Sequence, residues 1–213
     1  NSTAEALRLT RHAYEAGADG TLIACPYYNK PTQEGLYRHY ELIAKSVPIP
    51  IIPYNIPGRT GVNMSPELIA RLSEIKNIVG IKEASGSLKQ MNDVIDMCPP
   101  AFDVLSGDDG FTLPLMAIGG KGVISVASNV VPADMAAMVE AARAGDFKKA
   151  GKLHKKMSRL FDLLFIEVNP TPVKAALAMM GKIEYEYRLP LCPMAQANYE
   201  KLKEALLDYG LIT

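Results

Sequence analysis

The chain has 213 residues, of which 48% are hydrophobic and 22% charged, the composition of an ordinary globular protein. Its formal net charge is zero and no basic stripe or block is present, which argues against nucleic acid and a charged membrane surface as partners. No run of residues approaches the ~20 apolar positions that a membrane span needs.

The cysteines and histidines exclude two further classes of protein. Three cysteines, odd in number and widely spaced, form no disulfide framework and predict a reducing, cytoplasmic compartment: Cys25, Cys98 and Cys192. The three histidines lie far apart and share no metal-ligand spacing with the cysteines, which argues against zinc.

Helical and extended patterns alternate along the first two thirds of the chain. Helices are predicted over residues 3–16, 33–46, 66–75, 87–97, 110–118 and 132–143. Strands are predicted within residues 20–29, 48–55, 77–84, 101–107 and 119–128. Strands that are nearly continuous apolar runs and alternate with helices are typical of a parallel sheet with both faces covered. No strand is followed by a glycine-rich dinucleotide fingerprint.

The pattern changes after residue 144. Helices predicted at about 146–165, 171–180 and 194–208 follow one another with no strand between them. We therefore predict two domains, residues 1–144 with the βα units and residues 145–213 as a helical domain.

Five βα units fit either an open sheet or part of a closed barrel, which needs eight strands. The chain begins with Asn1 rather than Met, and Ser2 and Glu5 have the spacing of a capping box, so a helix starts at once. This abrupt start favours an α/β fold of the (β/α)8 TIM-barrel type that lacks its first three strands here.

Lys82 is the sharpest candidate for chemistry, at the end of the apolar strand predicted over residues 77–84. Lysine is rarely buried without a partner. One interpretation is a lysine that reaches solvent or pairs with Glu83 or Asp108, and the other is a nucleophile that forms a Schiff base. An amine attacks a carbonyl only when it is neutral, and burial favours that form. The resulting imine is an electron sink that lets the adjacent carbon become nucleophilic.

Two more side chains stand near strand ends, where ligands bind in either architecture. Tyr54 ends the strand before that of Lys82, and neighbouring strands lie ~4.8 Å apart, so the two side chains can meet. A phenol accepts and donates the protons that imine formation needs, whereas the alternative is a hydroxyl in water. Arg59 follows a Pro-Gly turn and is either a bidentate carboxylate ligand or an ordinary solvated charge.

Two motifs are interpreted as structural. The glycine-rich stretch at residues 119–122 resembles a phosphate cradle, but it precedes a strand, at the wrong end for a site, and glycine permits tight turns there. Asp108 and Asp109 have the chemistry of a magnesium site, but adjacent acids before a helix are more often its N-cap. We predict no metal.

Five stretches together resemble the dihydrodipicolinate synthase family, pyruvate-binding class I aldolases on (β/α)8 barrels that share a superfamily with N-acetylneuraminate lyase. In chain order they are "PYYNKPTQEGLYRHY", "PYNIPGRTG", "GIKEASG", "LSGDD" and "GGKGVISVASN". The resemblance covers essentially the whole chain, including "NPTPVKAAL" and "YRLPL" in the helical tail.

The resemblance implies roles for individual residues. Lys82 matches the lysine that forms the imine with pyruvate, and Tyr54 matches the tyrosine that relays protons above it. Tyr28 matches a tyrosine that reaches into a neighbouring subunit's site, which implies a homo-oligomer, expected to be a tetramer. Arg59 matches the arginine that holds the carboxylate of the aldehyde substrate. Two positions match the lining of the pyruvate pocket: Gly107 and Ile124.

The implied enzyme is a lyase that condenses pyruvate with L-aspartate 4-semialdehyde in lysine (diaminopimelate) biosynthesis. No cofactor is needed, because the imine supplies the electron sink. Arg59 favours this reaction over retro-aldol cleavage of 2-oxo sugar acids, since sialic acid lyases usually lack that arginine. The lyase reaction, and an inactive fragment or relic that binds small acids, stand as alternatives.

Two further expectations follow from the resemblance. The family's N-terminal third, with three strands and a paired-threonine motif, has no counterpart here, so the 213 residues are expected to be part of a longer polypeptide or to be complemented by a second chain. Asn1, Glu5 and Tyr27 match positions where some members bind lysine as a feedback inhibitor at a subunit interface.

Overall fold

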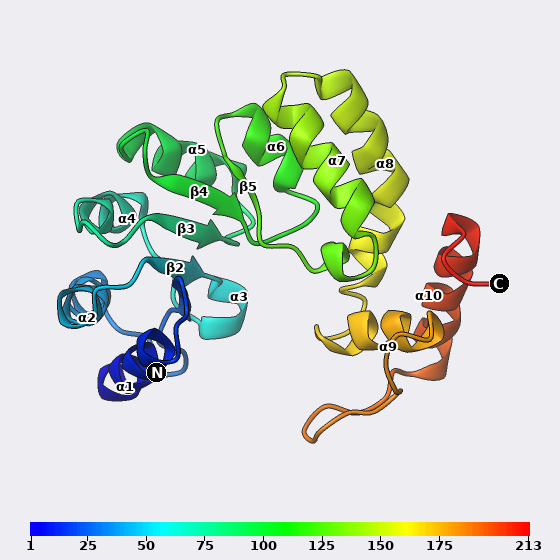
Figure 1. Cartoon of the computed structure of the whole chain (residues 1–213), viewed down its shortest axis with the longest axis horizontal. Coiled ribbons are helices and arrows are strands. Elements are labelled where there is room, and N and C mark those ends of the chain that lie inside the picture. Colours follow the sequence, from blue (N-terminus) through cyan, green and yellow to red (C-terminus); the bar gives the residue numbers. More distant parts are fainter. The chain divides into compact units, whose positions relative to one another are not determined.

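In the computed structural model, which describes residues 1–213, five parallel strands form one sheet (Figure 1). The strands are β1 (Thr21–Ala24), β2 (Ile51–Asn55), β3 (Gly80–Glu83), β4 (Asp103–Ser106) and β5 (Gly122–Val123). Each strand pairs with its neighbours in the sequence, whereas a doubly wound sheet reverses its strand order at a switch point. A sequential parallel order is that of a (β/α) barrel wall. The predicted α/β fold class is confirmed.

Six helices accompany the sheet in the first of two units, residues 1–124. They are α1 (Thr3–Glu15), α2 (Gln33–Ser46), α3 (Pro57–Thr60), α4 (Pro66–Ser73), α5 (Leu88–Met97) and α6 (Thr112–Ala117). Helix α2 packs on α1 and α4, and α5 packs on α4 and α6. Helices α2, α4 and α5 lie along the same side of the sheet (Figure 1). Four helices start at a hydroxyl that accepts a backbone N–H three residues on: Ser2, Thr32, Ser65 and Ser87.

The two faces of the sheet differ in what covers them. In β2, Ile51, Pro53 and Asn55 are buried, and Ile52 and Tyr54 between them are half-buried. Ile51 belongs to the apolar core that the sheet shares with helices α2, α4 and α5. Because successive side chains of a strand point to opposite faces, Asn55 faces the helices and Tyr54 the other side.

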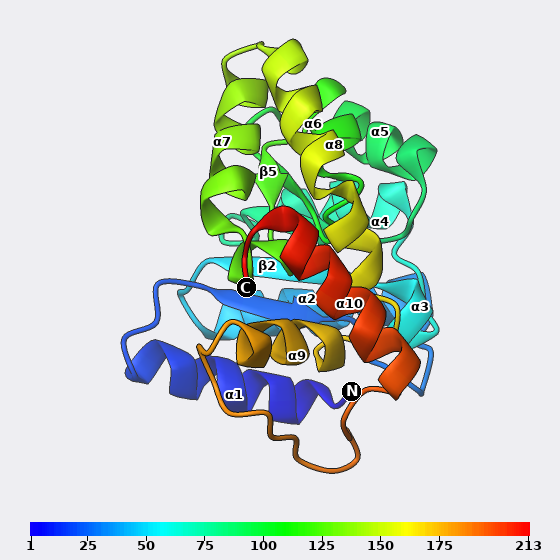
Figure 2. The ribbon, with the colours of Figure 1, turned by 90° about the vertical axis from the view of Figure 1, so that its right-hand side faces the viewer.

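The second unit, residues 125–213, is helical. It contains the 3₁₀ helix η1 (Ala127–Asn129), α7 (Pro132–Arg143), α8 (Phe147–Leu163), α9 (Thr171–Met179) and α10 (Gln196–Tyr209). Helices α7 and α8 lie side by side, and α10 packs on α8 and α9 (Figures 1 and 2). The predicted consecutive helices without a strand are confirmed, while the domain boundary after residue 144 stays a prediction. No helix of the chain is long and apolar enough to cross a membrane.

Two strands, β1 and β5, end earlier than the sequence predicts. β1 ends at Ala24, so Tyr27 and Tyr28 lie on the loop that follows rather than on the strand. β5 ends at Val123, and residues 127–129 form η1 in place of the expected strand. Ser125 accepts the backbone N–H of Ser128 at 2.8 Å. Such side-chain bonds to nearby backbone compete with strand pairing.

Two local predictions before helices are wrong. The loop expected at Arg59 is the short helix α3, because the N–H groups of Arg59 and Thr60 both bond to the carbonyl of Ile56 at 3.0 Å. Asp108 and Asp109 do not cap α6, whose N-cap is Phe111 with no side-chain bond. The Asp108 carboxylate instead accepts the N–H of Gly110 at 2.8 Å, which closes a turn.

Candidate active site

Lys82 and Tyr54 lie together at the carboxyl ends of neighbouring strands. They are register partners in the β2–β3 pair. The Lys82 Nζ atom lies 4.3 Å from the centroid of the Tyr54 ring, and the lysine is only 9% exposed. Strand pairing therefore brings an amine and a phenol to the same point, on the face of the sheet opposite the helix-packed core.

Burial and neighbouring charges set the ionisation of this pair. Burial lowers the pKa of Lys82 below its ordinary value, Asp109 acts to raise it, and the positive charge of Arg59 lowers it further. Burial raises the pKa of the Tyr54 phenol; Arg59 opposes this and Asp108 adds to it. The site therefore increases the neutral fraction of the amine and keeps the phenol protonated. The ring face, which attracts an ammonium, works against the first effect.

Gly107 leaves the space that the Lys82 side chain occupies. A Cβ atom at Gly107 would lie 2.8 Å from Cβ of Ala84 and 3.1 Å from Cε of Lys82. The N–H of Gly107 donates to the carbonyl of Glu83 at 2.8 Å, and the N–H of Ile124 donates to that of Ser106 at 2.9 Å. Gly107 thus lies directly against Lys82, and Ile124 continues the same sheet edge beyond β5.

Arg59 is exposed on α3, which follows β2 after one residue. Its charge acts on both Lys82 and Tyr54, so the structure includes it in the same cluster. Gly61, with φ +76°, ends α3 in the left-handed conformation that favours glycine. Helix α3 therefore places the exposed Arg59 at the rim of the site.

Tyr28 lies apart from this cluster in the single chain. Its side chain is 88% exposed, and its backbone has φ 73°, an uncommon value for a bulky residue. The N–H of Tyr28 donates to the carbonyl of Thr60 at 3.3 Å, which ties its loop to the end of α3. The backbone is thus anchored beside Arg59 while the phenol projects into solvent.

Asn1, Glu5 and Tyr27 line one cavity of about 480 Å³ together with residues of α1 and β1. The Glu5 carboxylate is already bound by Arg8 on the same helix, at 2.8 and 2.6 Å. The structure thus brings the three predicted effector residues together, in a place separate from Lys82.

Glu83 does not lie where one interpretation of the sequence places it. That interpretation makes it an ion-pair partner of Lys82, but its side chain faces the opposite side of the sheet. It is fully buried and accepts from the Asn55 side chain at 2.9 Å and the Ser85 N–H at 2.6 Å. Side chains along a strand alternate between the two faces of the sheet, so the adjacent residues Lys82 and Glu83 must face opposite sides. This alternation is the signal that could have placed Glu83 from the sequence.

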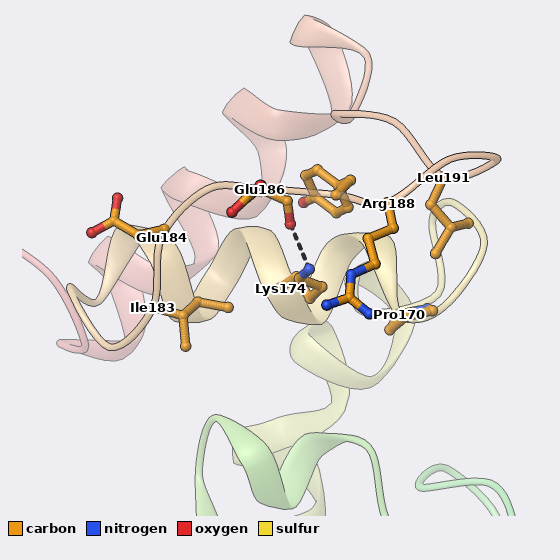
Figure 3. Close-up of a pocket in the computed structure, with 8 residues that line it drawn as sticks. Pro170, Lys174, Ile183, Glu184, Glu186, Arg188 and Leu191 are labelled. Carbon is orange, nitrogen blue, oxygen red and sulfur yellow. Dashed lines mark hydrogen bonds between the residues drawn. The ribbon is translucent and has the colours of Figure 1, made fainter.

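A cavity of about 610 Å³ lies in the second unit, between α9 and the segment that follows it (Figure 3). The Lys174 Nζ atom there donates to the carbonyl of Glu186 at 2.5 Å and lies 4.9 Å from the Tyr187 ring centroid. Its ammonium is therefore engaged, and none of the residues predicted from the sequence lines this cavity. No group of three or more His, Cys, Asp or Glu side chains in the chain is arranged to hold a metal ion.

Comparisons with known proteins agree with this geometry. The model of the dihydrodipicolinate synthetase family matches residues 1–208. A 4-hydroxy-tetrahydrodipicolinate synthase of Syntrophus aciditrophicus (strain SB) is 68% identical over 212 residues, 100% of this chain and 73% of the relative.

Two solved structures are similar throughout. Dihydrodipicolinate synthase from Aquifex aeolicus is 50% identical, with a TM-score of 0.97 over 99% of this chain and 72% of that one. The chloride-inhibited enzyme from Acinetobacter baumannii, complexed with pyruvate, is 48% identical, with a TM-score of 0.97 and the same coverage, 99% and 72%. The chain therefore belongs to the dihydrodipicolinate synthetase family.

Proposed function

We propose that this protein condenses pyruvate with L-aspartate 4-semialdehyde through an imine on Lys82. The observation that carries the proposal is the buried Lys82 amine over the Tyr54 ring, with its pKa lowered by burial. The synthase name of the relative at 68% identity and the pyruvate complex of the Acinetobacter enzyme support it.

The chemistry begins with the neutral amine of Lys82. It adds to the ketone carbon of pyruvate, and the carbinolamine then loses water to give the imine. Tyr54, whose raised pKa keeps its proton, donates that proton to the departing oxygen. The Tyr54 phenolate left by that transfer then takes a proton from the methyl carbon, and the resulting enamine attacks the aldehyde. The amine of the second substrate then attacks the imine carbon and displaces Lys82, so no cofactor is required.

Three residues select and hold the substrates in this proposal. Arg59 binds the carboxylate of the aldehyde substrate, since a guanidinium grips a carboxylate with two hydrogen bonds. Gly107 and Ile124 line the place of pyruvate, and the missing side chain of Gly107 also admits Lys82.

Tyr28 acts in a neighbouring subunit's site in this proposal, within a homotetramer. Its 88% exposed phenol supports this, as does its backbone conformation, which costs about 1–3 kcal/mol and persists only where its surroundings impose it.

The three free thiols of Cys25, Cys98 and Cys192 support a cytoplasmic location. Lysine is the proposed effector for the cavity of Asn1, Glu5 and Tyr27, where its ammonium competes with Arg8 for Glu5. A calorimetric titration without heat of lysine binding would rule the effector out.

Turnover assays test the function directly. The intact polypeptide is expected to consume pyruvate and aspartate semialdehyde together, and Lys82→Arg, which keeps the charge but forms no stable imine, is expected to abolish this. Lys89→Arg is the matched control, because Lys89 is exposed and pairs with Asp93 away from the site. A wild-type protein without turnover, or an active Lys82→Arg variant, would contradict the proposal.

A further inference from the structure

We propose that four side chains behind the sheet form a positioning network that holds Lys82 against Tyr54. This rear network consists of Asn55, Asn63, Glu83 and Gln90. The proposal rests on the function proposed above and adds residues that never touch the substrates. They lie on the helix-facing side of the strands whose other side carries the amine and the phenol.

The centre of the rear network is the pair formed by Asn55 and Glu83. These two residues follow Tyr54 and Lys82 directly and are register partners, as Tyr54 and Lys82 are. Both are fully buried, and their side chains share a hydrogen bond of 2.9 Å. The other Glu83 oxygen accepts the Ser85 N–H at 2.6 Å. The hydrogen bond between Asn55 and Glu83 joins the ends of β2 and β3 one residue beyond Tyr54 and Lys82. It therefore fixes the distance between the two reacting side chains.

The rest of the rear network ties down the loop behind Arg59. Asn55 Oδ1 accepts the N–H of Met64 at 3.0 Å, and Asn55 Nδ2 also donates to Asn63 Oδ1 at 2.8 Å. The amide of Asn63 donates to Gln90 on α5 at 2.8 Å, and the Gln90 amide returns bonds to Asn63 and Met64 at 3.2 Å. Helix α3, which carries Arg59, lies between Asn55 and Asn63, so both of its ends are held.

Glu83 acts here by position rather than by charge. Its carboxylate accepts from neutral amide donors on the far side of the sheet. The groups that face Lys82 are Tyr54 from β2, Arg59 from α3 and Asp109 from the loop after β4. These three groups are left intact in every variant used to test the rear network.

Only one arrangement of donors and acceptors satisfies every hydrogen bond of the Asn55–Glu83 pair. The backbone N–H groups of Met64 and Ser85 lie at its two ends and can only donate. Glu83→Gln therefore turns an amide NH₂ toward either Ser85 or the Asn55 amide, and two donors face each other. A buried donor without an acceptor is unfavourable, so the strand ends separate. In Asn55→Asp with Glu83→Gln the bond between residues 55 and 83 is restored with its direction reversed, while the bond from residue 55 to Asn63 Oδ1 is lost.

The test measures imine formation at Lys82 across pH, with pyruvate trapped by borohydride in the intact polypeptide. Glu83→Gln is expected to move the acid limb of this rate to higher pH and to lower the rate at pH 7 severalfold, because a loosened Lys82 regains water and its pKa rises toward the ordinary value. The double variant is expected to recover part of the loss, because it restores the bond between the two strand ends but not the bond to Asn63. Glu74→Gln is the matched control, since Glu74 is exposed at the end of α4.

The outcomes separate the two proposals. A Glu83→Gln variant with an unmoved acid limb and rate overturns the positioning role, even where its melting temperature falls, since that marks the rear network as structural only. If Glu83→Gln does not fold, Gln90→Ala replaces it, because its 3.5 Å contact with Glu83 is the weakest of the set. Gln90→Ala is expected to slow trapping, and an unchanged rate overturns the proposal. A wild-type protein that forms no adduct overturns the proposed function instead.

Discussion

Gly107→Ala is expected to disable Lys82 in a protein that still folds. The new Cβ atom would lie 2.8 Å from Cβ of Ala84, 3.1 Å from Cε of Lys82 and 3.2 Å from its Cγ. Carbon atoms pack favourably at about 3.5–4.0 Å, so the Ala84 contact must open by at least about 0.7 Å. Ala84 has no rotamer to change, so that contact opens only if the backbone at the end of β4 moves. The Lys82 side chain must move as well to relieve its own two contacts.

The structural cost and the functional cost of Gly107→Ala differ in size. Overpacking of a close contact costs about 1–3 kcal/mol of stability, which lowers the melting temperature of a chain of this size by roughly 2–12 °C. Displacing a reacting group by about 1 Å lowers a rate up to about a hundredfold. The variant is therefore expected to trap pyruvate on Lys82 between about ten and a hundred times more slowly than wild type.

Trapping of pyruvate with borohydride, followed by the mass of the protein over time, measures this rate. Gly58→Ala is the matched control, because its Cβ atom meets nothing within 4 Å although the residue adjoins Arg59. Circular dichroism establishes that both variants fold. An imine rate in Gly107→Ala equal to that of wild type would refute the close packing of Gly107 on Lys82.

Three further predictions concern stability, pH and substrate binding. Gly151→Ala in α8 is expected to raise the free energy of unfolding by about 0.5–1 kcal/mol, because its Cβ atom meets nothing within 4 Å and alanine favours a helix; urea unfolding without a gain would contradict this. Burial lowers the pKa of His39 to about 4. The unfolded state then binds the proton first, so stability is expected to be complete above pH 6.5 and to fall by about 3 kcal/mol as the pH drops from 6.5 to about 4. His39→Gln is expected to flatten that slope in pH-dependent unfolding, and an equally steep slope would exclude His39 as its source. Arg59→Ala is expected to raise KM for aspartate semialdehyde about 10- to 100-fold, the loss of a charged hydrogen-bonded pair, while pyruvate trapping on Lys82 changes less; an unchanged KM would remove Arg59 from substrate binding.

The wall of parallel strands and the meeting of Lys82 with Tyr54 were predictable from the sequence. Both depend only on apolar runs separated by helical patterns and on the rule that parallel strands end at one edge. The register Tyr54↔Lys82 then follows from neighbouring strands of similar length.

Other features depend on contacts that a single sequence does not display. The pairing of Asn55 with Glu83 requires the register and the burial of both side chains. The early end of β5 is accompanied by a local hydrogen bond of Ser125, and in helix α3 two N–H groups converge on the carbonyl of Ile56. The space that Gly107 leaves for Lys82 is a tertiary contact, although the glycine itself was singled out by resemblance.

The most direct test of imine formation on Lys82 is mass spectrometry of the intact protein treated with pyruvate and borohydride. One reduced pyruvate adduct per chain is expected, located by peptide mapping on Lys82 and absent in Lys82→Arg. The intact mass of the untreated sample also measures the length of the polypeptide. An adduct on any other lysine, or no adduct in a protein that consumes both substrates, would contradict the assignment of Lys82 as the imine-forming residue.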